Sequence, residues 1–250
     1  MRMAFTMVTG RWLLLGSALL QLASPVLIGF EQDGWEDPVV VPPGSFFGIW
    51  SLITAGCVAA AVWGLPRRRA ASMPYRAVQG PVSVAQLLFG AWLVAADTVP
   101  VLTVPVFVAM VAVLTHALRI VVATPTDRLT RLLLGGTLGL YTGWSTTAVW
   151  LNVATLLPVE VRANQAVLTA FLIGAAVAGV AGALLFRGSP GFVAAAAWAF
   201  TGILVSTVQE DAPGLAGVAA VGLVAVLVTG VVARLRSGAL SSEAAGQRHR

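Results

Sequence analysis

The sequence predicts an all-α fold, a polytopic transmembrane bundle of about eight helices, and three observations carry this prediction. Of the 250 residues, 58% are hydrophobic and only 10% are charged, which is too much apolar surface for a soluble domain to bury. The apolar runs continue for about 20 residues at a time, the length of a membrane-spanning helix. None alternates as barrel strands do, so helices must pair the backbone polar groups in lipid.

Eight apolar segments follow one another along the chain, and each is about long enough to cross a bilayer. The pair Pro42 and Pro43 places the start of the second helix at Gly44 or Ser45. The first segment could instead be a cleaved signal peptide, but its apolar run is longer than a usual signal core and no convincing cleavage site follows. The segments cover residues 12–29, 44–64, 81–97, 99–122, 132–154, 165–185, 192–208 and 214–233.

The arginines predict the orientation of the helices in a cell membrane. If both termini are cytoplasmic, every arginine except Arg162 falls in an inner segment, as the positive-inside rule expects. The polar stretch 237–250 shows no periodicity and is predicted to be a disordered cytoplasmic tail.

The composition also argues against several classes of function. The arginines are scattered at helix ends, so the basic balance reflects topology and indicates no nucleic-acid partner. The single Cys57 lies in an apolar run, and His116 has no Cys, Asp or Glu at metal-ligand spacing, so no disulfide or metal site is predicted. Paired intramembrane carboxylates, a nucleophile with a base and a phosphate loop are all missing, so the sequence does not indicate an enzyme.

The segment 44–64 carries an aromatic face in its outer half. Phe47, Trp50 and Thr54 share this face with Pro43 at helical spacing. An aromatic belt at the membrane interface would explain Trp35 without any binding site, and it remains an alternative for the deeper Trp50.

The segment 132–154 has two different faces. Gly135, Gly139 and Gly143 form a small-residue stripe that lets another helix approach closely. Polar groups inside a membrane are costly, so the opposite face is either a functional site or a set of hydrogen bonds to neighbouring helices. That face gathers Tyr141, Trp144, Ser145, Ala148 and Asn152.

The segment 81–97 adds a weaker polar face. Gln86, Gly90 and Leu93 lie on one side of it together with Asp97 at the outer end. We expect Gln86 to make an interhelical hydrogen bond and Asp97 to be an exposed end residue.

Three motifs resemble the tryptophan-rich sensory protein or translocator protein family, TspO/MBR. They are WEDPVVVPPGSFFGIWSLI, AQLLFGAW and YTGWSTTAVWLN, and the last matches the family pattern at Tyr141, Trp144, Ala148, Leu151 and Asn152. The resemblance implies a five-helix core over 1–157, a three-helix extension over 158–236 and the tail 237–250.

The resemblance further implies a hydrophobic planar ligand, notably a porphyrin or a sterol, in a sensory or transport role. No other cofactor is implied. Glycine-rich faces are compatible with a homodimer and equally with packing inside one chain. The residues that match the family's ligand pocket are Trp35, Phe47, Trp50, Trp92, Tyr141, Trp144 and Asn152.

Two other functions remain open at the level of sequence. A secondary transporter or permease component could line its path with the same aromatic face, although no pair of broken helices indicates inverted repeats. A structural membrane-assembly protein would use the glycine stripes, including Gly174, Ala178 and Gly182, only for helix packing.

Overall fold

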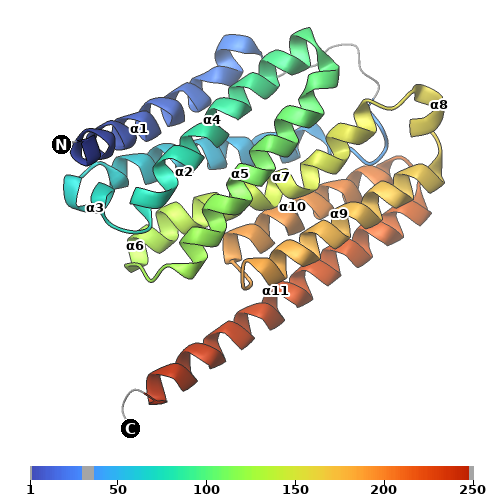
Figure 1. The fold of residues 1–250 in the computed structure, drawn as a ribbon. Coiled ribbons are helices and arrows are strands. Elements are labelled where there is room, and N and C mark those ends of the chain that lie inside the picture. The colour runs from blue at the N-terminus through green and yellow to red at the C-terminus, as the bar shows by residue number, and fades with distance from the viewer. Residues whose placement is uncertain (1, 30–36, 248–250) are drawn as a thin grey trace.

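The computed structural model describes residues 2–29 and 37–247, and the side chains of residues 10–29 and 37–238. Within this part of the chain the regular structure is entirely helical, which confirms the predicted all-α bundle (Figure 1). The long helices are α1 (Arg2–Ile28), α2 (Ile49–Gly64), α4 (Tyr75–Thr98), α5 (Thr103–Ala123), α7 (Thr137–Thr155), α9 (Gln165–Leu185), α10 (Pro190–Gln209) and α11 (Pro213–Gln247).

Short helical turns lead into or connect the long helices. A 3-10 turn, η1, precedes α2 directly after Pro43, which confirms the predicted helix start. A π-helical turn, η3, precedes α7. The short elements are η1 (Gly44–Gly48), α3 (Arg67–Ala71), η2 (Pro100–Leu102), α6 (Arg128–Thr130), η3 (Arg131–Gly136) and α8 (Val159–Arg162).

Seven of the described helical segments are long and apolar enough to cross a membrane. The eighth predicted segment, 132–154, forms η3 and α7 but does not belong to these seven. Its threonines, Ser145 and Asn152 lower its hydropathy. Other helices surround α7, and 11 of its 19 residues are buried, so it does not need an apolar surface for lipid.

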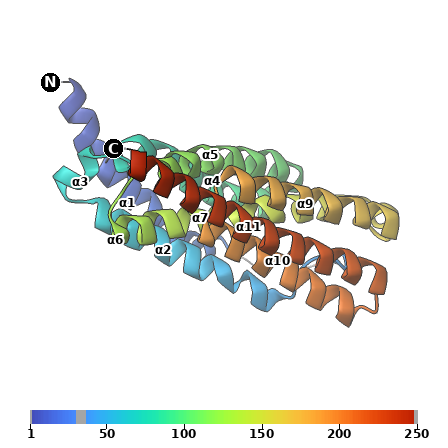
Figure 2. The same ribbon diagram turned by 90° about the horizontal axis from the view of Figure 1, so that it is seen from below.

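The central helix α7 joins two groups of helices. On one side α1 packs on α4 and α2, and α4 packs on α5; on the other side α9, α10 and α11 pack together. The most extensive packing in the described chain joins α7 to α10, and α7 also contacts α5, α9 and α2. Figures 1 and 2 show α7 between the two groups.

Three helix boundaries differ clearly from the sequence prediction. Helix α1 begins at Arg2 and not at residue 12. Helix α4 begins at Tyr75 and not at residue 81, because its first turns contain Arg76 and Gln79 and so fall outside the apolar run. Helix α11 continues to Gln247, so residues 237–247 are helical where a disordered tail is predicted. Ala, Glu and Gln are good helix formers, and no proline interrupts this stretch.

Candidate functional site

The orientation of α7 follows from its glycines. The backbone of Gly191 and Phe192 in α10 lies where a Cβ of Gly139 or Gly143 would have to be. This close approach confirms the expected role of Gly139 and Gly143, whereas Gly135 faces the side chain of Val121 in α5. With that face against α10, α7 presents Tyr141 and Trp144 to α2 and α4.

The second wall of the site begins at η1. Phe47 lies on this turn, and Trp50 is the second residue of α2. Helix α10 anchors this turn, because the indole N–H of Trp198 in α10 donates a hydrogen bond to the carbonyl oxygen of Phe46 at 2.9 Å. The rings of Phe46 and Trp198 also contact each other at 4.7 Å between centroids.

The rings from these helices form one aromatic cluster. Trp50 lies at its centre, with centroid distances of 4.6 Å to Phe89, 5.6 Å to Tyr141 and 6.4 Å to Trp144. The contacts to Tyr141 and Trp144 are edge-to-face, a favourable geometry for aromatic pairs. Further ring contacts extend the aromatic cluster to a total of seven side chains: Phe47, Trp50, Phe89, Trp92, Phe107, Tyr141 and Trp144.

Five of the seven residues predicted to line a ligand pocket thus belong to the aromatic cluster. Asn152 takes no part in its ring contacts and lies two turns beyond Trp144 on α7. Trp35 lies outside the described residues. The predictions for Gln86 and Asp97 are confirmed, since Gln86 accepts a hydrogen bond from Ser17 of α1 at 2.6 Å and Asp97 is exposed.

Several polar atoms around the aromatic cluster have no hydrogen-bond partner. The hydroxyl of Tyr141 donates to the carbonyl oxygen of Ala85 at 3.2 Å, but the indole nitrogen of Trp144 and the hydroxyl of Ser145 are buried without a partner. The side-chain oxygen of Asn152 is also buried and unpartnered. Buried polar groups usually find partners, so these atoms mark places where a further molecule could bind.

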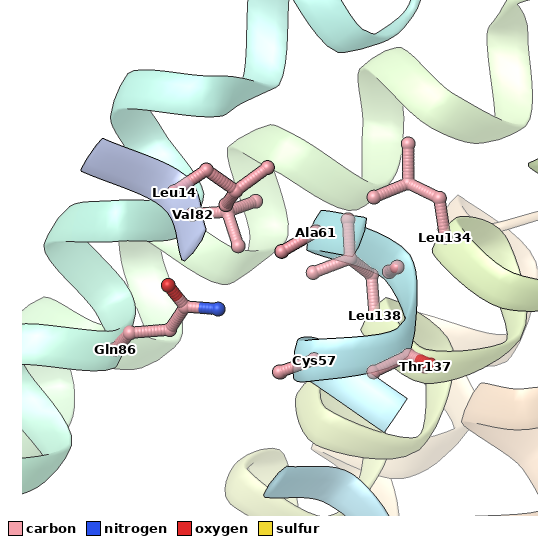
Figure 3. A pocket seen from close by; sticks show the side chains of 9 residues that line it. Leu14, Cys57, Ala61, Val82, Gln86, Leu134, Thr137 and Leu138 are labelled. Carbon is pink, nitrogen blue, oxygen red and sulfur yellow. The ribbon is translucent and has the colours of Figure 1, made fainter. Parts of the chain in front are cut away.

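The aromatic cluster is closed in this structure. Trp144 is 1% exposed and Trp50 5% exposed, so the rings fill the space between α2, α4 and α7 themselves. A small cavity of about 10 Å³ lies deeper, between Cys57, Gln86 and Thr137, with the amide nitrogen of Gln86 directed into it (Figure 3). That volume corresponds to a single water molecule.

An open groove of about 410 Å³ lies on the other side of α7. Trp150 and Phe171 stand edge-to-face in its wall, and Asn164 at the start of α9 forms one end. This groove is separate from the aromatic cluster, which contributes none of its walls.

The polar face of α1 was not predicted from the sequence. Ser17, Gln21 and Ser24 are buried against the bundle, and both side-chain polar atoms of Gln21 lack a partner. Their spacing of four and three residues on an otherwise apolar segment is the signal that could have revealed this face.

The loop between α1 and α2 brings the carboxylate of Asp37 near Arg162 of α8. Burial raises the pKa of Asp37 above its ordinary value, and the nearby charge of Arg162 in α8 opposes this shift. The aromatic cluster itself contains no carboxylate, histidine or arginine, and the described residues contain no group of His, Cys, Asp and Glu suited to a metal ion.

Comparison with known proteins identifies the family. The family model described as "TSPO-like protein" matches residues 33–233, most of the 250-residue chain. The match begins after α1 and includes α9, α10 and most of α11, which the sequence analysis treats as an extension. No curated protein and no solved structure matches the chain significantly.

Proposed function

The chain belongs to the TSPO-like protein family and is an integral membrane protein, and from this premise we propose that it binds a flat hydrophobic ligand between α2 and α7. The ligand class is a porphyrin or a sterol, held in a sensory or transport role. The observation that carries the proposal is the buried indole N–H of Trp144, which has no partner although it lies within a cluster of aromatic rings.

Binding requires the rings of Trp50 and Trp144 to separate, and the packing of the helices favours α2 as the element that moves. Helix α7 is held tightly by α10 through Gly139 and Gly143, whereas its packing on α2 is much less extensive. A planar ligand would then stack on the exposed indole faces. The N–H of Trp144 would then donate a hydrogen bond to an acceptor atom of the ligand. This bond would remove the free-energy cost of leaving a buried N–H group without an acceptor.

Porphyrin binding by purified variants tests this proposal. Trp144→Phe keeps an aromatic ring but removes the N–H donor, so we expect about fivefold to tenfold weaker binding of protoporphyrin from the loss of one hydrogen bond. Trp50→Ala removes a stacking surface and should weaken binding further. The shift in porphyrin absorbance is the preferred readout, because removing a tryptophan changes the protein's own emission.

The matched control is Trp12→Phe, since Trp12 is 54% exposed on α1 and lies outside the aromatic cluster. It should bind porphyrin as the parent does. The thermal midpoint of each variant separates loss of binding from loss of folded protein. Parent-like affinity in both Trp144→Phe and Trp50→Ala would mean that the ligand binds elsewhere.

A further inference from the structure

Two loops at one end of the bundle are joined by a tryptophan. Residues 65–74 connect α2 to α4 through α3, and residues 124–130 lead from α5 into η3. The indole N–H of Trp63, at the end of α2, donates to the hydroxyl oxygen of Thr130 at 3.0 Å, which ties the start of the first loop to the second. Figure 1 shows α3 and α6 at the same end of the bundle.

The same tryptophan holds one arginine in place. The guanidinium of Arg69 lies 3.6 Å from the ring centroid of Trp63 and donates to the Trp63 carbonyl oxygen at 2.5 Å. This combination of a cation–π contact and a hydrogen bond fixes Arg69 against the protein. Arg69 is thus engaged inside the structure.

The only carboxylate of these two loops is also engaged. Asp127 accepts a hydrogen bond from the Thr130 hydroxyl at 2.6 Å and another from the Thr130 backbone N–H at 2.9 Å. These bonds hold the pKa of Asp127 below its ordinary value, so it stays ionised. One carboxylate cannot balance the arginines around it.

The remaining arginines in and directly beside the two loops are exposed. Arg67 and Arg68 are exposed on α3, Arg76 is exposed in the first turn of α4, and Arg128 is exposed on α6. A nearby Arg131 is exposed as well, although it donates to the Thr126 carbonyl oxygen at 3.2 Å. The joined loops therefore present a cationic surface directly beside the membrane-spanning helices.

We propose that this cationic surface, formed by Arg67, Arg68, Arg76 and Arg128, binds the phosphate headgroup of an anionic phospholipid. Charge complementarity supports the assignment, because guanidinium groups pair with phosphate oxygens in a planar, two-pronged geometry. The position supports it too, since the span-capable helices α2, α4 and α5 adjoin these loops, which places the arginines at headgroup level. The surface is independent of any ligand in the aromatic cluster.

Lipid retention tests the proposal with the full-length protein. The parent is reconstituted in phosphatidylcholine with a minor fraction of phosphatidylglycerol, and the lipids that remain bound after transfer to detergent are counted by native mass spectrometry. We expect phosphatidylglycerol to be enriched on the parent. In the double variant Arg67→Gln, Arg68→Gln, the enrichment of phosphatidylglycerol should fall about fivefold for each arginine removed. Arg67→Lys, Arg68→Lys should lose less of it than the glutamine variant, because lysine keeps the charge but cannot make the two-pronged contact.

The matched control is Arg234→Gln, Arg236→Gln, which removes the same number of exposed arginines from the single helix α11. It should retain the parent's enrichment. An equal loss of enrichment in this control would mean that any exposed arginine attracts anionic lipid, and it would overturn the proposed site. Parent-like enrichment in the Arg67→Gln, Arg68→Gln variant would also overturn it. Release of the lipid by millimolar inorganic phosphate would overturn the choice of a lipid over a free anion.

Discussion

Gly143 of α7 lies against the carbonyl oxygen of Phe192 in α10, at a point where a Cβ atom would overlap that oxygen. Gly143→Ala should therefore push the two most extensively packed helices apart and destabilise the protein by about 1–3 kcal/mol, as overpacking does. The thermal midpoint in detergent measures the effect. Gly16→Ala is the control, because no atom lies near its added Cβ and alanine favours a helix. Equal midpoints for the two variants would contradict close α7–α10 packing.

Trp198→Phe should loosen η1. The variant loses the hydrogen bond to the Phe46 carbonyl oxygen but keeps an aromatic ring, so we expect a loss of about 0.5–1.5 kcal/mol in stability. Hydrogen–deuterium exchange should rise at the turn 44–48 and stay unchanged at α3, at the opposite end of the bundle. An increase spread evenly over both ends would indicate general unfolding and refute a local anchor.

The lowered pKa of Asp127 should make the stability of the protein depend on pH. Hydrogen bonds from the Thr130 side chain and backbone lower the pKa of this carboxyl below 3.8 in the folded protein. Its stabilising contribution is therefore present above the pKa of the unfolded state and is lost as pH falls through the folded-state pKa. Asp127→Asn should have a lower thermal midpoint than the parent at neutral pH, and the difference should shrink in acid. A difference that does not change with pH would disprove the assignment.

The arginine distribution predicts the topology. A reporter fused after Arg250 or inserted at Arg67–Arg69 should be cytoplasmic, and one inserted near Glu36 should be external. Accessibility in intact cells, compared with permeabilised cells, measures each site. An external reporter at Arg250 would rule out an even number of crossings with a cytoplasmic N-terminus.

The sequence predicted most of the fold because lipid imposes simple rules on helix length and apolarity. It also predicted the contact face of Gly139 and Gly143 from their spacing alone. Family motifs combined with helical periodicity brought Phe47, Trp50 and Trp144 together as lining of a ligand pocket, and the structure places these three rings in contact with one another. That they line a ligand pocket stays a prediction.

Features that depend on tertiary packing escaped prediction. Helical spacing placed Tyr141 and Asn152 on one face, but it could not show that Tyr141 joins the aromatic cluster while Asn152 does not. The anchor between Trp198 and Phe46 joins residues 152 positions apart, which no local pattern reveals. The separation of a core from an extension also stays a prediction, although α10 packs on α7 more extensively than any other described pair of helices.

The polarity of α7 has a consequence for biogenesis. This helix lacks the apolarity of the seven span-capable segments, so the insertion machinery should not release it into lipid by itself. Its glycines and threonines become acceptable in the bilayer only when neighbours cover them, and the neighbour against its glycines, α10, is synthesised later. A nascent chain that stops after residue 157 should therefore fail to integrate α7 stably and be degraded, which makes membrane integration of the N-terminal half dependent on the translation of α10.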